Sequence, residues 1–311
     1  LVEFPKQKSE MILQLLYLRY YNSLQYIAMQ NLLLKRQKAH YFYATMFVNT
    51  MNQYGIKSVL KHFPGEADQC KSVTDLSSAE LNRLFGETKV KILVGCAPCQ
   101  PFSSYTFKDP EKKDNEKWKL LYEFQRLILE SKPDIISMEN VSQLINFKKA
   151  PVFDDFIKTL NSEGYFTHFE IVNCPEYGIP QNRKRLVLLA SKLGEINLTP
   201  KTHSKDNFIT VKDAIGNLPP IEDGEYYQGD KMHFARKLSP LNKKRIQNTP
   251  YGGSWKDWSE ELRLECHKKE SGKSYSSVYG RMKWEEPSPT MTTHCVGYGN
   301  GRFGHPQQDT G

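Results

Sequence analysis

Residues 90–100 read VKILVGCAPCQ, so a mainly apolar run is followed at once by a glycine and small or polar residues. A short apolar run that ends at a glycine is typical of a buried strand. The same arrangement recurs along the chain from about Phe63 to Ser191, where short apolar runs alternate with amphipathic stretches. This alternation predicts an α/β fold built on a largely parallel sheet.

Individual elements of this region can be placed from their periodicity. The stretch 115–130 has large apolar residues at helical spacing, and Lys132-Pro133-Asp134 ends it ahead of the next apolar run. A second helical pattern closes near Gly164. The predicted elements are strands at 90–94, 135–138, 169–172 and 186–189, and helices at 115–130 and 152–160.

The two ends of the chain differ from this middle region. Residues 192–311 are polar, aromatic and punctuated by glycine and proline, which predicts a smaller, loop-rich domain. Residues 1–60 fit neither pattern, because they contain no glycine before Gly55 and no acidic residue after Glu10. We therefore expect an atypical N-terminal segment at 1–60, an α/β domain at 61–191 and a loop-rich domain at 192–311.

Composition narrows the class of protein. A chain with 39% hydrophobic and 25% charged residues does not suit a disordered tail, and no apolar run is long enough to span a membrane. The six cysteines are too sparse for a disulfide framework and lack zinc-like spacing, so we expect a cytoplasmic protein. The net charge of +8 lies mostly in the first 65 residues, so nucleic-acid binding has to be argued from motifs.

Polar segments adjoin three of the predicted strands. Ligands of open α/β sheets bind beyond the strand ends, which makes these segments candidate site residues. They are 95–100 (GCAPCQ) and 139–141 (ENV), each following a strand, and 181–185 (QNRKR), just before another. Each segment also has an ordinary structural explanation. Cys99 could be a buried structural cysteine, Glu139 could cap a helix, and Arg183 and Arg185 could lie on a solvent-exposed charged surface. Cys96 and Cys99 also form a C-x-x-C pair, which could be a redox couple.

Taken in this order, the three segments resemble the DNA cytosine-5 methyltransferases of bacterial restriction-modification systems. Two further segments, 286–293 (EPSPTMTT) and 297–306 (GYGNGRFGHP), are similar to the end of the family's target-recognition region. Asp75-Leu76 resembles its short acidic motif, and the resemblance runs from about Lys61 to Asp309. It implies a Rossmann-like S-adenosylmethionine-dependent methyltransferase fold with a smaller, loop-rich target-recognition domain.

The resemblance implies transfer of a methyl group from S-adenosylmethionine to C5 of a flipped cytosine in a specific duplex DNA sequence. Cytosine C5 is a poor nucleophile, and a thiolate that adds to C6 activates it. By this resemblance Cys99 is the nucleophile, and Glu139 binds or protonates cytosine N3. Arg183 and Arg185 then hold cytosine O2 and nearby backbone groups.

The resemblance also implies binding residues and partners. The expected partners are double-stranded DNA and, as a genetic partner, a cognate restriction endonuclease. We expect a monomer in the bacterial cytoplasm, associated with the nucleoid, and no metal. The cofactor contacts implied are Asp75 and Pro98, and the DNA contacts implied are Gln100, Ser103, Thr290 and Arg302.

Two features of the family pattern are missing. The family opens with an Asp-x-Phe-x-Gly-x-Gly-Gly loop that lets the cofactor approach the backbone, and no glycine precedes Gly55 here. The sequence also stops at Gly311, before the segment that completes the cofactor pocket in the family. We therefore expect weak or absent S-adenosylmethionine binding. A foreign reading frame joined near His62 with a truncated C-terminus is one explanation, and an unusual N-terminal helical segment is the other.

Other functions stay open from the sequence. A catalytically silent DNA-binding remnant would still engage DNA through residues 192–304. A thiol oxidoreductase would use Cys96 and Cys99, and Cys96→Ala would then abolish its function while leaving methyl transfer in a methyltransferase nearly intact. Methylation of RNA is less favoured, because the long region after Ser191 suits recognition of a DNA sequence.

Overall fold

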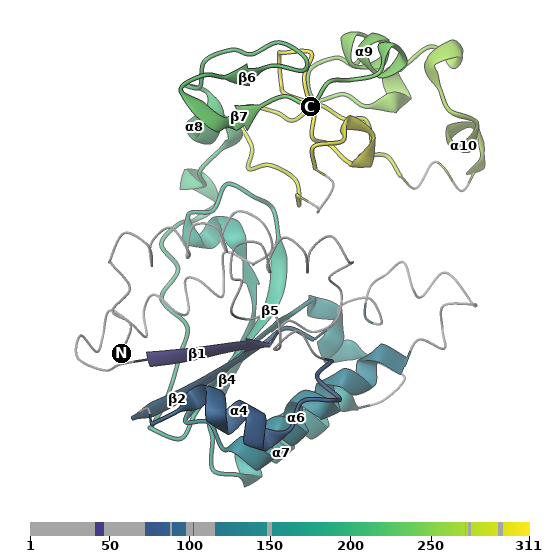
Figure 1. Cartoon of the computed structure of the whole chain (residues 1–311). Helices are drawn as coiled ribbons and strands as arrows, with labels where there is room; N and C mark the ends of the chain where they lie inside the picture. Colours follow the sequence, from purple (N-terminus) through teal and green to yellow (C-terminus); the bar gives the residue numbers. More distant parts are fainter. Residues whose placement is uncertain are drawn as a thin grey trace. The chain divides into compact units, whose positions relative to one another are not determined.

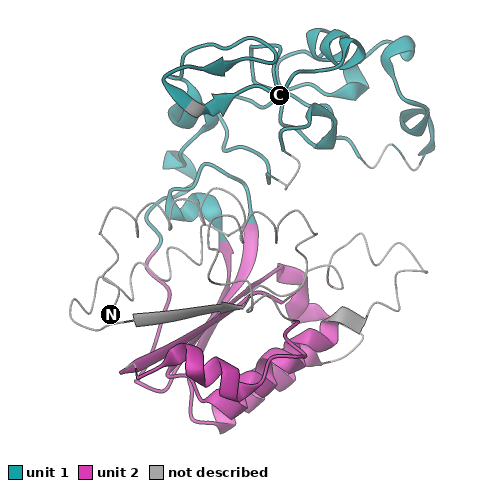
Figure 2. Ribbon diagram, viewed as in Figure 1, with its two compact units in different colours: residues 1–20, 173–183, 201–311 teal, residues 21–172, 184–200 magenta. Residues whose placement is uncertain are grey.

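The computed structural model describes two compact units (Figure 2). The sheet unit takes in the described residues up to Val172 together with Lys184–Pro200, and the loop-rich unit takes in Asn173–Arg183 and Lys201–Gly311. Among the described residues, no helix has the length and apolar character needed to cross a bilayer. The structure describes residues 41–46, 72–87, 89–97, 102, 116–147, 151–270, 272, 275–291 and 295–311, with the backbone alone for 41–46, 116, 117 and 231.

The sheet unit is built on a five-stranded sheet of order β1-β2-β3-β5-β4 (Figure 1). β1, β2 and β3 are parallel, whereas β5 runs antiparallel to β3. The sheet is therefore mixed, and the predicted α/β class is confirmed. The strands are β1 (Tyr41–Met46), β2 (Val90–Gly95), β3 (Ile135–Asn140), β4 (Phe166–Asn173) and β5 (Lys184–Ser191).

β1 lies within the segment for which the sequence predicts no strand. Its backbone pairs with β2 over six residues, from Tyr41 opposite Val90 to Met46 opposite Gly95. The sequence YFYATM has no alternation of apolar and polar residues and no flanking glycine or proline, so the usual signals of a strand are missing. Pairing with β2 is a long-range interaction that this local sequence does not reveal.

Three helices pack on one face of the sheet (Figure 1). A capping box begins α4, in which the Ser77 hydroxyl accepts from the Glu80 N–H and the Glu80 carboxylate accepts from the Ser77 N–H. α6 ends at Lys132, which adopts a left-handed conformation with φ of 48° just before Pro133. The helices are α4 (Ser78–Phe85), α6 (Leu120–Ser131), which follows the 3₁₀ turn η4 (Glu116–Lys119), and α7 (Val152–Ser162).

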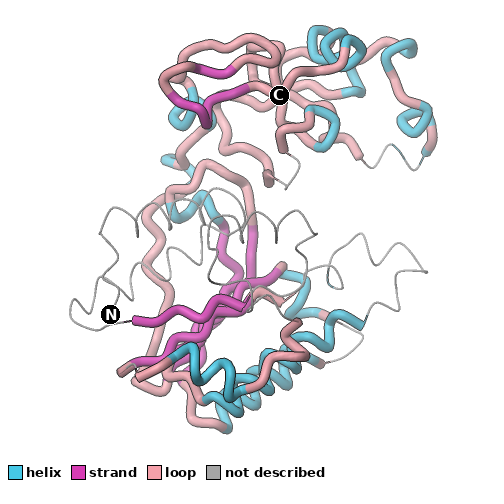
Figure 3. Tube along the Cα trace, in the orientation of Figure 1, coloured by secondary structure: helices cyan, strands magenta, loops and turns pink. Residues whose placement is uncertain are grey.

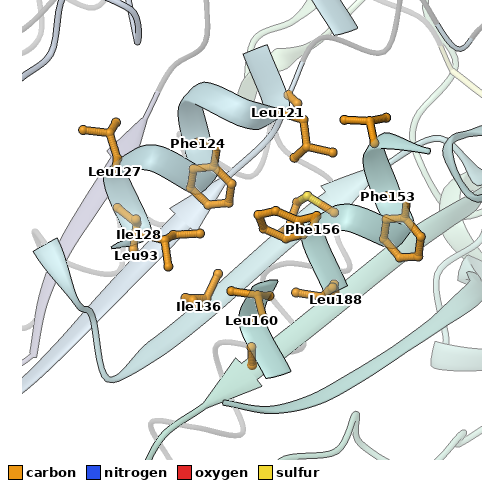
Figure 4. Packing of buried hydrophobic residues seen from close by; sticks show 14 of the residues in the cluster. Leu93, Leu121, Phe124, Leu127, Ile128, Ile136, Phe153, Phe156, Leu160 and Leu188 are labelled. Atoms are coloured by element: carbon orange, nitrogen blue, oxygen red, sulfur yellow. The ribbon is translucent and has the colours of Figure 1, made fainter. Parts of the chain in front are cut away.

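The core of the sheet unit lies between these helices and the central strands (Figure 4). Leu93, Ile136 and Leu188 face Phe124 of α6 and Phe156 of α7, whose rings stack with centroids 5.9 Å apart. The other face is also buried, as expected for strands in the middle of an α/β sheet. It carries a smaller cluster of Val90, Ile92, Val94 and Ile135, with Ile196 packed against it.

The loop-rich unit contains short elements joined by long irregular segments (Figure 3). This agrees with the smaller, loop-rich domain that the sequence predicts. Its helices and strands are α8 (Val211–Ile215), β6 (Tyr226–Tyr227), β7 (Asp230–Phe234), α9 (Pro240–Gln247) and α10 (Glu265–Lys268). It also contains the 3₁₀ turns η6 (Cys174–Tyr177), η7 (Lys205–Asn207), η8 (Trp255–Asp257), η9 (Glu260–Leu262) and η11 (Tyr298–Asn300).

A buried arginine organises the centre of the loop-rich unit. Arg281 is only 5% exposed, and its guanidinium forms an ion pair with the carboxylate of Asp309. Buried carbonyls in irregular segments need a donor, and this guanidinium supplies it to three of them and adds a second donor to the Ile246 carbonyl at the end of α9. The carbonyls that accept from Arg281 are those of Ile246, Thr249, His305 and Gln308, at 2.6–2.9 Å.

Candidate functional site

Polar residues from three strands meet at one edge of the sheet. β2 and β3 are parallel with Gly95 opposite Met138, so Cys96 and Glu139 come next to each other at the strand ends. β5 runs antiparallel to β3, so Arg185, near the start of β5, lies at the edge where β3 ends. Cys96, which follows one strand, Glu139, at the end of the next, and Arg185, near the start of a third, thereby lie at the same end of the sheet.

Glu139 is the centre of this edge. Its side chain is buried, with the residue 2% exposed, and forms an ion pair between Oε1 and the Arg185 Nε at 2.9 Å. The Cys96 thiol donates a hydrogen bond to Oε2 at 3.2 Å. Burial of a carboxylate is costly unless it is paired and hydrogen-bonded; the Cys96 thiol supplies a hydrogen bond to Oε2, and Arg185 supplies an ion pair to Oε1 whose geometry does not make it a hydrogen bond. Both carboxylate oxygens are thus held from neighbouring strands.

Asn140 ties the segment after β2 to the end of β3. Its side chain is 1% exposed and donates from Nδ2 to the Ala97 carbonyl at 3.1 Å. Its Oδ1 accepts from the backbone N–H of Val141 at 2.8 Å. Because all its contacts are to backbone, Asn140 fixes the course of the chain where it leaves the sheet toward Cys99. Four predicted site residues, Pro98, Cys99, Gln100 and Ser103, lie outside the described residues.

Gly95, the last residue of β2, allows α6 to pack closely against the end of this strand. A Cβ atom added to Gly95 would lie 2.4 Å from Cζ of Phe124, which is itself 3% exposed. Real Cβ atoms do not approach a ring so closely, so only glycine fits this position without a shift of the helix or the strand end. The position of Cys96 therefore depends on the packing of Phe124 as well as on the sheet.

The loop-rich unit brings together two segments that lie more than a hundred residues apart in the sequence. The backbone N–H of Asn182 donates to the Ser288 carbonyl at 2.7 Å, and the Ser288 N–H donates to the Pro180 carbonyl at 2.9 Å. Arg183 directs Nη1 toward the Met291 carbonyl at 3.4 Å. Arg183 thus belongs with residues 287–291 of its own unit, whereas Arg185 belongs to the sheet unit and pairs with Glu139.

Thr290 and Arg302, the predicted DNA contacts within the described residues, both form hydrogen bonds inside the loop-rich unit. The exposed Thr290 donates from Oγ1 to the Asn182 carbonyl at 2.7 Å. Arg302 is half-buried and donates from Nη1 to the carbonyls of Gly252, Gly253 and Arg281. These contacts give both residues a role in the fold, and their contact with DNA stays a prediction.

Asp75, the predicted cofactor contact, lies in an exposed turn ahead of α4. Its backbone N–H donates to the Ser72 carbonyl at 3.0 Å, and Oδ1 accepts from the Thr74 hydroxyl at 3.2 Å. A carboxylate has about four acceptor positions, so Asp75 can accept further donors from a ligand. In the part of the chain that the structure describes, no group of three or more His, Cys, Asp or Glu residues is placed to hold a metal ion.

The sequence does not reveal the contact of Cys96 with Glu139. It offers Cys96 only as half of a C-x-x-C pair, because no local pattern links residues 43 positions apart. One sequence signal could have indicated this contact: Cys96 and Glu139 hold equivalent positions just after the apolar residues of β2 and β3. If those strands are neighbours and parallel, their terminal side chains meet.

Comparisons with known proteins agree with this geometry. Residues 26–309 match the family model described as C-5 cytosine-specific DNA methylase, a match that starts earlier than the resemblance expected from about Lys61. The chain is 54% identical over 239 residues to the type II methylase M.HgiDII of Herpetosiphon aurantiacus, covering 77% of this chain and 67% of that protein. It is 32% identical over 230 residues to the type II methyltransferase M1.HgaI of Avibacterium volantium, covering 70% and 62%.

Among solved structures, the fold is similar to that of an E. coli prophage-encoded protein described as a candidate DNA modification methyltransferase. The TM-score is 0.54 at 19% identity, over 80% of this chain and 74% of the other. This likeness bears on the fold alone. The chain spans about two thirds of the length of the two curated relatives above.

Proposed function

Because the chain belongs to the C-5 cytosine-specific DNA methylase family, we propose that it transfers a methyl group from S-adenosylmethionine to C5 of cytosine in duplex DNA. The observation that carries this proposal is the buried carboxylate of Glu139, held by Arg185 and Cys96 at the end of β3. The two relatives named above are type II methylases, so we place the protein in a restriction-modification system with a cognate restriction endonuclease as its genetic partner.

Cys99 is the proposed nucleophile. It follows Cys96 by three positions, in the segment whose start is fixed by Asn140 and Ala97. Its thiolate forms a bond to cytosine C6, and the ring electrons that this addition displaces make C5 nucleophilic. S-adenosylmethionine supplies the methyl group. Loss of the C5 proton then returns an electron pair to the ring and expels the cysteine as a thiolate.

Glu139 is the proposed acid for cytosine N3. Addition of a thiolate to C6 places negative charge on the ring, and a carboxyl group that binds or protonates N3 relieves it. Arg185 balances the charge of the carboxylate when the proton has been given up. Its remaining N–H groups can donate to cytosine O2, and we extend this role to Arg183 by the resemblance of its motif.

The reaction requires the base to leave the helix. A cytosine stacked in a duplex does not expose C6 to a buried site, so we propose that it flips out, at a cost of a few kcal/mol. We assign target recognition to residues 192–311, which include Thr290 and Arg302, with Gln100 and Ser103 on the segment around Cys99. Asp75 is the proposed contact for the adenine of S-adenosylmethionine, because its exposed carboxylate can accept from the amino group, and Pro98 is a second contact.

Methyl transfer to unmethylated genomic DNA tests this proposal without knowledge of the recognition sequence. Radiolabelled methyl groups should appear on cytosine with the wild-type chain and be absent with Cys99→Ala. Ser162→Ala, at an exposed position of α7 outside the proposed sites, is the control and should transfer normally. Transfer that persists in Cys99→Ala would rule out Cys99 as the nucleophile.

A second candidate is a catalytically silent DNA-binding remnant. The sequence feature that favours it lies in residues 1–54, which contain no glycine and therefore no glycine-rich cofactor loop. This candidate predicts sequence-specific DNA binding with no labelled product and weak or absent binding of S-adenosylmethionine. Calorimetry that detects clear micromolar binding of S-adenosylmethionine by the isolated chain contradicts it.

A further inference from the structure

We propose that Cys96 is a positioning residue for the reaction, which acts by holding the carboxyl group of Glu139 in one orientation. The inference rests on the proposed function, because it assumes that Glu139 faces the cytosine. It concerns a thiol that the reaction scheme itself does not use. The structure places this thiol against the central carboxylate of the site, at 3.2 Å.

The two contacts of Glu139 come from opposite sides of the residue's own strand. β3 lies between β2 and β5 in the sheet, Cys96 follows β2, and Arg185 belongs to β5. Rotation about the last side-chain bond of glutamate is broad, so one contact leaves the plane of the carboxyl group free to turn. A contact to Oε1 from Arg185 together with one to Oε2 from Cys96 removes that freedom.

The main chain around Cys96 is well fixed. Gly95 lies against the ring of Phe124, and the next residue, Ala97, accepts from the Asn140 side chain at 3.1 Å. The thiol is therefore carried by backbone that is anchored on both sides. A donor fixed in this way can hold its acceptor in place, which a donor on a mobile segment cannot do.

A thiol has properties that suit this position. It is a weak donor, and each carboxylate oxygen has two lone pairs, so Oε2 can accept from Cys96 and still share a proton with cytosine N3 or accept from the N4 amino group. A lysine or arginine here would add a second cation and compete more strongly with the cytosine. The contact also revises the sequence-based expectation that Cys96→Ala leaves methyl transfer nearly intact.

Single-turnover kinetics separate positioning from binding. In Cys96→Ala we expect the transfer rate constant to fall about tenfold, which corresponds to loss of one hydrogen bond of ordinary strength. The KM values for DNA and S-adenosylmethionine should stay within about twofold, because Cys96 is not proposed to touch either. Cys96→Ser should recover most of the rate, since a hydroxyl also donates. A rate for Cys96→Ala that equals the wild-type rate overturns the proposal.

A double variant tests whether Cys96 acts through Glu139. In a Glu139→Gln background the added Cys96→Ala change should cause no further loss of rate, because the carboxylate that it positions is already absent. An equal loss in both backgrounds shows that Cys96 acts elsewhere and contradicts the proposal. Ser162→Ala, at an exposed position of α7 that is given no role in the reaction, is the control, with no change expected in either background.

Infrared spectroscopy tests the contact without any turnover. The S–H stretching band of Cys96 is obtained from the difference between the wild type and Cys96→Ser. We expect Glu139→Gln to move this band to higher frequency, because a neutral amide is a weaker acceptor than a carboxylate. An unmoved band overturns the proposal. If the band moves but the wild type transfers no methyl group, the proposed function fails while the contact between Cys96 and Glu139 stands.

Discussion

The two units of the molecule use arginine in different ways. In the sheet unit the core is aliphatic and aromatic, and Arg185 lies at its edge, paired with the carboxylate of Glu139. In the loop-rich unit Arg245 and Arg281 lie inside the core and donate mainly to backbone carbonyls. An arginine bound to loop carbonyls replaces the hydrogen bonds that a sheet would supply, whereas one bound to a carboxylate at strand ends supports a reactive group.

Aromatic rings complete the environment of the buried arginines. The Arg245 guanidinium lies 5.4 Å from the ring centres of both Trp258 and Tyr279, and its Nε donates to the Leu262 carbonyl at 2.9 Å. Such cation–π contacts are worth more when they are shielded from water. The loop-rich unit therefore depends for its stability on a few cations surrounded by carbonyls and rings, and the sheet unit depends on ordinary strand and helix packing.

Loss of Arg281 should have the largest effect on stability. Arg281→Leu removes the guanidinium donor from the Thr249, His305 and Gln308 carbonyls and from the Asp309 carboxylate, and it leaves the Ile246 carbonyl with only the Thr249 N–H. Several buried groups lose a charged partner at once, so we expect the free energy of unfolding of the loop-rich unit to fall by about 4 kcal/mol or more. Urea unfolding followed by the fluorescence of Trp255 and Trp258 measures this loss.

Arg236→Leu is the matched control for that change, because Arg236 is an exposed arginine of the same unit. It should alter the unfolding midpoint little. Hydrogen exchange should show that amides of β2 and β3 keep their protection in Arg281→Leu. If both arginine variants are equally stable, the contrast between the two units does not hold.

Breaking the ion pair at the sheet edge should have the next largest effect. Arg185→Gln leaves the buried carboxylate of Glu139 without its cation, and we expect a loss of about 3 kcal/mol in the sheet unit. The double variant Glu139→Gln/Arg185→Gln removes both charges and should be more stable than Arg185→Gln alone. Circular dichroism during urea unfolding compares the two, and the opposite order would show that the carboxylate is not destabilised by losing this partner.

The sequence predicted most of what the sheet unit requires. β2 and β3 and the helices after them were placed because their apolar patterns are strong and because Lys132-Pro133-Asp134 and Gly164 mark helix ends. The rule that ligands bind beyond the carboxyl ends of strands singled out residues 139–141. Residues 181–185 precede their strand and were joined to them only by the family resemblance; they reach the same end of the sheet because β5 is antiparallel to β3. Side-chain partners could not be predicted, since the register that brings Cys96 beside Glu139 is a property of the paired strands.

For the loop-rich unit, the sequence predicted only its general character, a small domain rich in loops, and none of its internal contacts. Arg302 illustrates the reason: the family resemblance implied a DNA contact for it, but its three carbonyl partners lie 21 to 50 positions away in the sequence and could not be predicted. The pairing of Asn182 with Ser288 is equally remote. Contacts of this kind produce no periodic pattern in the amino-acid sequence, because neither segment is a regular helix or strand.

The stability of the loop-rich unit should fall on acidification by a moderate amount. Burial, with smaller contributions from Arg281 and His233, lowers the pKa of His305 to about 4. The unfolded chain takes up a proton first, so this stability is present above about pH 6.5 and is lost as the pH falls toward 4. After allowance for solvent screening we expect about 1–2 kcal/mol.

His305→Asn should flatten this pH dependence. Nδ1 of His305 accepts from the backbone N–H groups of Gln307 and Gln308, which a protonated ring cannot do. An asparagine oxygen can accept the same hydrogen bonds and does not titrate. Unfolding curves at pH 7.5 and pH 4.5 test this, with His168→Gln in the sheet unit as the control. An unchanged slope in His305→Asn contradicts the assignment.

The smallest effect, and the one that tests the role of an exposed residue, is expected for Thr290. Thr290→Val removes the hydrogen bond from Oγ1 to the Asn182 carbonyl, and an exposed carbonyl can turn to water, so we expect a loss of at most about 1 kcal/mol. If Thr290 also contacts DNA, Thr290→Val weakens binding to the cognate duplex by more than this small loss of stability can explain. Thr290→Ser keeps the hydroxyl and should restore both properties. Equal affinity of all three proteins for DNA would limit Thr290 to joining residues 287–291 to residues 180–183.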